Sequence, residues 1–154
     1  MKYTFLLLAF LVCPCANAEK WKTYHDAKLG IEFQYPETWS CKWEEANRPT
    51  LLVKGTATQA SYVGFQITPK NPQNLPIETW YKTTQRPDPG AHMGKFAGLP
   101  AMIVPRTKGD GVYNVYEIAR PGGSILAVVT RQFPSDPTAK PTVERIINSC
   151  KFDK

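Results

Sequence analysis

Alternation of apolar and polar residues at a period of two is the feature that most limits how this chain can fold. In the segment "IEFQY", Ile31, Phe33 and Tyr35 fall on one side of an extended chain and the polar residues fall on the other. Pro36 follows at once, lacks a backbone N–H and disfavours a helical conformation at the residue before it. The segment is therefore predicted to be a half-buried strand that ends in a turn.

The same period recurs in the rest of the chain. Residues 39–44 place Trp39, Cys41 and Trp43 on one face, and are predicted to form a strand that runs back beside the first. The adjacent Gly122 and Gly123 can adopt the positive φ that a tight hairpin between two late strands requires. Further strands are predicted at 50–54, 62–68, 101–104, 112–119 and 124–133.

Two segments, "NLPIETWYKTTQ" and "KPTVERIINSCKF", change to helical spacing. In each, apolar residues recur at i, i+3, i+4 and i+7, which places them on one face of a helix. Strands outnumber helices and neighbouring strands are joined by hairpins, so the sequence predicts an α+β domain with an antiparallel sheet and packed helices. The two stripes are Ile77, Trp80, Tyr81 and Thr84 in the first helix and Val143, Ile146, Ile147 and Cys150 in the second.

The first 18 residues have the order of a secretory signal peptide. A basic start at Lys2 precedes an apolar run over residues 5–12, and small residues lead up to the polar chain. The cleavage enzyme needs small side chains at the first and third positions before the cut, and Ala16 and Ala18 supply them. We expect residues 1–18 to be removed, residues 19–154 to form one domain, and the protein to be periplasmic or secreted.

Two other uses of the leader fit the sequence less well. Lipidation would require a small residue directly before the modified cysteine, but Cys13 follows Val12 and Cys15 follows Pro14. The apolar run is also shorter than the roughly 20 residues that a membrane-spanning helix needs. No transmembrane segment is therefore expected.

Cys41 and Cys150 are the cysteines that remain after cleavage. In an oxidising compartment two cysteines of one small domain commonly pair, and here both face inward with apolar neighbours. A bridge would close a loop of about 110 residues, which chain-entropy models value at roughly 4–5 kcal/mol. We therefore expect a disulfide between them.

Few residues suggest catalysis or a cofactor. His25 and Asp26 could share a metal or a proton, but a metal needs further donors and His92 is distant in the chain. Cys41 lies between tryptophans rather than in the accessible, electropositive setting of a catalytic thiol. There is no Gly-x-Ser-x-Gly motif. A non-enzymatic protein without a cofactor is expected, and a metal-binding protein or small-molecule enzyme that uses His25, Asp26 and His92 is the alternative.

Binding surfaces are indicated by aromatic and basic residues. Exposed aromatic side chains anchor many protein interfaces, although Trp21 would also suit a role in covering the sheet. Without the leader the net charge is +5, which favours weak contact with an anionic surface but is too small to indicate nucleic acid binding. The residues proposed to contact a protein partner are Lys20, Trp21, Lys22 and Tyr24 before the first predicted strand, and Trp80 and Tyr81 on the first helix.

Three segments resemble the PsbP-like family. They are "YHDAKLGIEFQYPETWS" at 24–40, where a strand ends in a Tyr-Pro-x-x-Trp turn, "GKFAGLPAMIV" at 94–104 and "TVERIINSCKF" at 142–152. The resemblance implies an antiparallel sheet flanked by helices, the α/β/α sandwich of PsbP and Mog-type proteins, which generally works as a binding scaffold.

The resemblance favours an exported, non-enzymatic binding or adaptor module that acts through protein–protein interaction in the cell envelope. An extrinsic photosystem-type subunit is an alternative. The plant subunit of this family carries a long N-terminal segment that contacts its complex, whereas this chain reaches its first predicted strand about a dozen residues after the expected cleavage site. Its photosystem binding and metal ions are therefore not transferred to this chain.

The leader assignment can be tested directly. When the full chain is expressed in a bacterium, N-terminal sequencing of the exported protein should begin at Glu19. Replacement of Ala18 by leucine should block the cut, because the cleavage enzyme requires a small side chain there. An exported product that begins at Met1, or that carries lipid on Cys13 or Cys15, would contradict the assignment.

Overall fold

A computed structural model describes residues 19–45, 48–56, 61–84, 88–109, 111–136 and 138–153. The predicted signal peptide lies outside the described residues. In chain order the elements are β1 (Trp21–Asp26), β2 (Ile31–Pro36), β3 (Ser40–Glu44), β4 (Thr50–Lys54), β5 (Tyr62–Thr68), α1 (Ile77–Thr84), β6 (His92–Phe96), β7 (Leu99–Lys108), β8 (Gly111–Arg120), β9 (Ser124–Gln132), α2 (Ala139–Ser149) and β10 (Lys151–Phe152).

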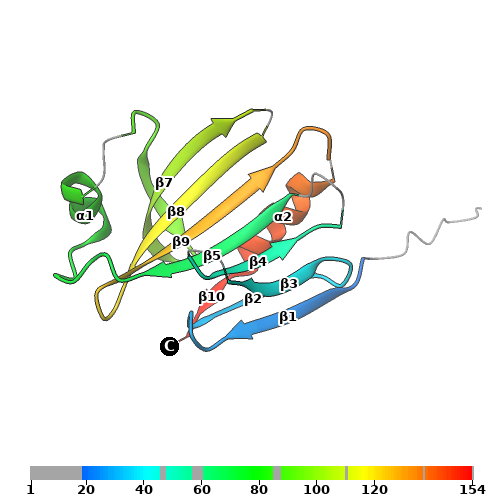
Figure 1. Ribbon diagram of the computed structural model, residues 1–154, viewed down its shortest axis with the longest axis horizontal. Coiled ribbons are helices and arrows are strands. Elements are labelled where there is room, and N and C mark those ends of the chain that lie inside the picture. Colours follow the sequence, from blue (N-terminus) through cyan, green and yellow to red (C-terminus); the bar gives the residue numbers. More distant parts are fainter. Residues whose placement is uncertain are drawn as a thin grey trace, which may run out of the picture.

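The strands form two antiparallel sheets (Figure 1). The larger has seven strands in the order β3-β4-β5-β9-β8-β7-β6, and the smaller has three in the order β1-β2-β10. Hairpins join β6 to β7, β7 to β8 and β8 to β9. This arrangement with two helices is the α+β architecture that the sequence predicts.

The small sheet and α2 pack together against one face of the large sheet. The aromatic ring of Phe33 on β2 stacks on that of Phe65 on β5, with centroids 4.8 Å apart. Beside them, the Gln34 N–H donates to the Ser149 hydroxyl at 2.8 Å, which ties the end of α2 to the edge of β2 that faces away from β1. The interface contains the main buried core, including Ile31, Leu51, Val53, Val63, Leu126, Val128, Val143 and Ile146.

The short helix α1 packs on the opposite face of the large sheet. Its residues contact Met102 on β7 and Ile125 on β9. Each lies next to a residue of the main core, Ala101 and Leu126 respectively, and consecutive strand residues point to opposite faces. No helix in the described part of the chain has the length and apolar character needed to cross a membrane.

The predicted strands at 50–54 and 62–68 are confirmed with the same bounds. The prediction that 39–44 pairs with 31–35 is wrong, because β3 pairs with β4 at the edge of the other sheet. The turn that begins at Pro36, closed by a hydrogen bond from the Trp39 N–H to the Pro36 carbonyl at 3.0 Å, carries the chain from one layer to the other. Strands β1, β6 and β10 are additions that residue periodicity does not predict.

Asp26, the last residue of β1, links the small sheet to β3 of the large sheet. The residue is 7% exposed, and its carboxylate accepts hydrogen bonds from the Leu29 N–H at 2.9 Å and the Trp43 indole N–H at 2.9 Å. The Tyr24 hydroxyl donates a longer bond of 3.4 Å. One side chain thus closes the β1–β2 turn and holds β3 of the other sheet against it.

Replacement of Asp26 by alanine should lower the free energy of unfolding by about 2–3 kcal/mol, because buried donors would be left unpaired. Urea denaturation measures the change. The control is His25→Ala, which removes only an exposed ion pair with Asp153 and should cost less than about 1 kcal/mol. Equal losses for the two variants would contradict the role assigned to Asp26.

Candidate functional site

The structure does not bring His25, Asp26 and His92 together. His25 and Asp26 are neighbours on β1 and point to opposite faces, and the His25 Nε2 lies 3.0 Å from the Asp153 Oδ1. His92 is on β6, where its Nδ1 lies 3.1 Å from the Gly90 carbonyl oxygen. Among the described residues, no group of three or more His, Cys, Asp or Glu side chains could hold a metal ion. The part of the chain that the structure describes therefore gives the metal alternative no site.

His25 instead joins a cluster that fastens the end of the chain. Asp153 pairs with it, and the Asp153 N–H donates to the Gly30 carbonyl at 3.1 Å. The Arg120 guanidinium lies over the Phe152 ring at 4.5 Å, and burial lowers its pKa while the Asp153 carboxylate opposes the change. These contacts hold β10 beside β2.

The expected disulfide is absent, since Cys41 and Cys150 are free thiols in the structure. Cys41 lies on β3 near β1, where burial and, secondarily, the Asp26 carboxylate raise its pKa to about 12. Cys150 lies beyond α2, where burial raises its pKa to about 12 and its Sγ contacts the Ile146 carbonyl at 3.4 Å. Cys41 lies near β1, Cys150 directly precedes β10, and these two strands flank β2 on opposite sides. The two cysteines therefore occupy different parts of the same core.

Trp80 and Tyr81 do not form the binding surface predicted for them. Their exposed fractions are only 2% and 6%, because the apolar stripe of α1 faces the large sheet. The Trp80 indole N–H donates to the Lys70 carbonyl at 2.8 Å. The helical spacing predicts the helix correctly, but the aromatic residues of its apolar stripe belong to the core instead of to a binding surface.

The other predicted surface lies at the outer edge of β1, which among the described strands pairs with β2 alone. Lys20 and Lys22 are exposed. Trp21 is half-buried, with the Arg145 guanidinium of α2 3.9 Å above its ring. Tyr24 packs its ring on Phe33, with centroids 5.5 Å apart. The exposed part of this surface is therefore basic, with Trp21 fixed at its border.

The register of β1 shows which backbone groups face outward. The Lys20 carbonyl accepts a hydrogen bond from the Glu37 N–H at 2.8 Å. In an antiparallel pair, hydrogen-bonded and non-bonded positions alternate, so Trp21, Thr23 and His25 direct their backbone groups away from β2. Pro36, which stands opposite Trp21, has no N–H to donate and fits that pattern.

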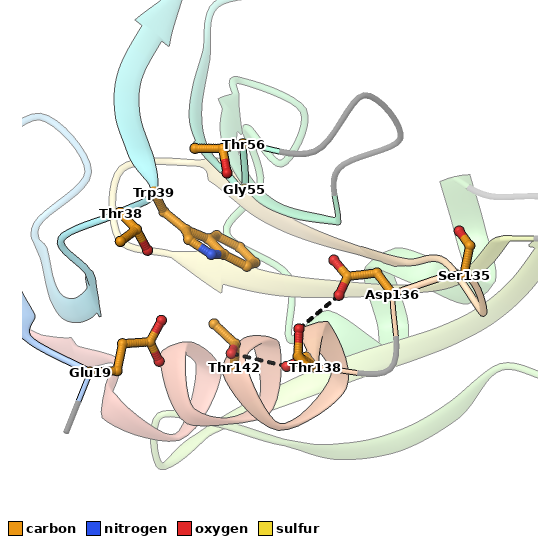
Figure 2. Close-up of a pocket in the computed structure, with 9 residues that line it drawn as sticks. All are labelled: Glu19, Thr38, Trp39, Gly55, Thr56, Ser135, Asp136, Thr138 and Thr142. Carbon is orange, nitrogen blue, oxygen red and sulfur yellow. Dashed lines mark hydrogen bonds between the residues drawn. The ribbon is translucent and has the colours of Figure 1, made fainter. Parts of the chain in front are cut away.

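A cleft of about 500 Å³ opens where the turn before β3, the end of β4 and the start of α2 meet (Figure 2). The sequence does not predict it, because its walls come from four separate segments. The lining residues that the structure describes are mostly polar and include one aromatic ring. They are Glu19, Thr38, Trp39, Gly55, Thr56, Ser135, Asp136, Thr138 and Thr142.

The geometry of the cleft is set by local contacts. A Cβ added at Gly55 would lie 3.4–3.6 Å from three indole atoms of Trp39, so the ring rests closely on the backbone there. On the opposite wall the Thr138 hydroxyl donates to the Asp136 carboxylate at 2.9 Å. The Thr142 hydroxyl donates to the Thr138 carbonyl at 3.1 Å. Figure 2 shows the Trp39 indole between Gly55 on one side and Thr138 and Thr142 on the other.

The raised thiol pKa values predict slow alkylation of the native protein. At pH 8 the thiolate fraction of Cys41 and Cys150 should be on the order of a thousandfold lower than in the unfolded chain. Timed reaction with iodoacetamide, with and without urea, followed by mass spectrometry measures this. Cysteines that stay unmodified even in urea without reductant would reveal a bridge and contradict the result.

The same shifts fix the sign of a pH effect. The unfolded thiols lose their protons near pH 9, while the folded thiols keep them up to about pH 12. The stability contributed by the neutral thiols is complete below about pH 9 and is lost as the pH rises through this window. Burial also raises the pKa of Tyr24, Tyr35, Tyr62 and Tyr116, which acts in the same direction.

Comparison with known proteins gives similarity of structure without similarity of sequence. No protein-family model matches the chain, and no curated protein matches it either. The solution structure of the cyanobacterial PsbP (CyanoP) from Synechocystis sp. PCC 6803 is similar, with a TM-score of 0.59 and 12% identity over 91% of this chain and 96% of that chain.

A crystal structure of a protein from Bacteroides thetaiotaomicron VPI-5482 is similar too, with a TM-score of 0.60 and 13% identity. The match covers 86% of this chain but only 48% of that one, so this chain spans about half of its length. At these identities the likeness concerns the fold alone. The resemblance seen in the three sequence motifs is confirmed at this level: the chain has a PsbP-like fold.

Proposed function

We propose that the protein is an exported, non-enzymatic binding module of the cell envelope that captures a protein partner by adding one of the partner's extended segments to β1. The observation that carries the proposal is the open edge of β1, with the outward backbone groups of Trp21, Thr23 and His25. An unpaired edge is a template for another strand, and several binding domains recognise peptides in this way.

The side chains around the edge favour an acidic partner. Lys20 and Lys22 are exposed on either side of Trp21, and Lys28 extends the basic surface with its ammonium 4.8 Å from the Trp43 ring centroid. Complementary charge accelerates association and aligns the incoming segment. The same lysines would support contact with an anionic surface, but the directional backbone groups favour a peptide over a diffuse charge.

Other functions have less support. Because the side chains of His25 and Asp26 point to opposite faces of β1 and His92 lies on β6, a metal-dependent enzyme has no site in the described residues. The likeness to the cyanobacterial PsbP, at 12% identity, supports a shared scaffold, and a photosystem role is not part of the proposal.

The experiment combines affinity capture with a backbone substitution. The protein recovered from cells that express the full chain is used to capture partners from the native host's envelope extract, which are identified by mass spectrometry. Thr23→Pro removes one outward N–H without removing a hydrogen bond to β2. It should weaken binding of the identified partner by roughly tenfold or more, about 1.4 kcal/mol.

The matched control is Thr23→Ala, which removes the same side chain and keeps the N–H, and should bind as the unsubstituted protein does. Thermal unfolding followed by circular dichroism verifies that both variants fold. Binding should also slow amide hydrogen exchange at Thr23 and His25. A partner that binds Thr23→Pro with full affinity, or the absence of any saturable partner, would overturn the proposal.

A further inference from the structure

The cleft between Trp39 and the start of α2 has the features of a ligand site, and the proposed partner edge does not use it. Its volume of about 500 Å³ lies within the roughly 300–1,000 Å³ of small-molecule sites. The Trp39 ring is braced from behind, because it packs so close to Gly55 that a Cβ added there would be in van der Waals contact with the indole. The indole is thus held in place before a ligand arrives.

The hydrogen-bonding groups of the opposite wall are mostly acceptors. The Thr138 hydroxyl already donates its proton to Asp136, and the Thr142 hydroxyl donates its proton to the Thr138 carbonyl. The lone pairs of both hydroxyl oxygens remain, together with the second oxygen of the Asp136 carboxylate. A ligand that satisfies this wall must therefore offer several hydrogen-bond donors.

The charge of the lining excludes several ligand classes. Among the described lining residues the charged side chains are the carboxylates of Asp136 and Glu19, and none is a lysine, arginine or histidine. These carboxylates would repel phosphates, nucleotides and acidic peptides. No aliphatic side chain of the kind that a lipid chain would need is among the described lining residues. Small cations usually occupy sites where several aromatic rings surround the charge, whereas the described lining has one, Trp39.

We propose that the cleft binds a neutral saccharide, with the apolar face of one sugar ring on the Trp39 indole. The ring hydroxyls would donate to Asp136 and to the hydroxyl oxygens of Thr138 and Thr142. Sugars present a C–H face and several hydroxyl donors on one rigid ring, which matches an aromatic wall opposite a wall of acceptors. Thr38, Thr56 and Ser135 add hydroxyls that can donate to the ring and linkage oxygens.

The test follows the Trp39 indole N–H by heteronuclear NMR of the isotope-labelled protein recovered from cells that express the full chain. The sequence has four tryptophans, and the loss of one indole signal in Trp39→Phe assigns the one of interest. Maltotriose, cellotriose and triacetylchitotriose are titrated separately to millimolar concentrations. At least one should shift the Trp39 signal saturably and leave that of the buried Trp80 in place.

Two threonine variants supply a matched pair. Thr142→Val removes an acceptor from the cleft and should weaken saccharide binding roughly fivefold. Thr83→Val is the control, because the hydroxyl of this exposed residue of α1 likewise donates to the carbonyl four residues earlier and lies outside the cleft. It should leave the affinity unchanged.

Three results would overturn the inference. The first is that none of the three trisaccharides shifts the Trp39 signal. The second is that spermidine, the cationic probe, shifts it saturably while the sugars do not. The third is that Thr142→Val binds as tightly as Thr83→Val. Because none of these measurements uses the β1 edge, they also distinguish failure of this site from failure of the proposed partner edge.

Discussion

The packing of β2 and α2 on one face of the seven-stranded sheet is the interaction on which the other features of the molecule depend. The stacked rings of Phe33 and Phe65 lie in this interface. Asp26 joins the two sheets by accepting a hydrogen bond from the Trp43 indole N–H. Burial of apolar surface supplies most of the stabilisation in such an interface. The hydrogen bonds of Asp26 fix how the two layers are aligned, since a buried carboxylate left unpaired would be costly.

Both candidate sites are products of this packing. Among the described strands, β1 has a free edge because the small sheet has the order β1-β2-β10, with β2 at its centre. The cleft exists because α2 begins at a distance from the turn before β3, and the gap is lined by Trp39 on one side and Thr142 on the other. Burial raises the pKa of both the Cys41 and the Cys150 thiol, which keeps them neutral near pH 7. In both proposals the packed core is a frame that positions the edge of β1 and the Trp39 cleft.

Much of the fold follows from the residue pattern, whereas the candidate sites follow from it only in part. The period of two in 62–68 predicts β5 because Val63, Phe65 and Ile67, each two residues apart, all belong to or pack against the main core. The stripe of Trp80 and Tyr81 predicts α1, but spacing alone does not say whether a stripe faces a partner or the chain's own sheet. The pairing of β3 with β4 instead of β2 depends on a change of layer at Pro36, which is a tertiary effect. The cleft depends on four segments meeting in space, and no local pattern records that.

The position of β2 between β1 and β10 has a consequence for how the molecule is made. Its two neighbours come from opposite ends of the described chain, and Lys151 pairs with Glu32 across more than a hundred residues. As the chain leaves the ribosome, the β1–β2 hairpin emerges first but cannot complete its sheet until α2 and the last residues arrive. Contacts so distant in sequence slow folding. The early hairpin, with Phe33 and Tyr24 not yet covered, is therefore the segment that a chaperone would need to protect during synthesis.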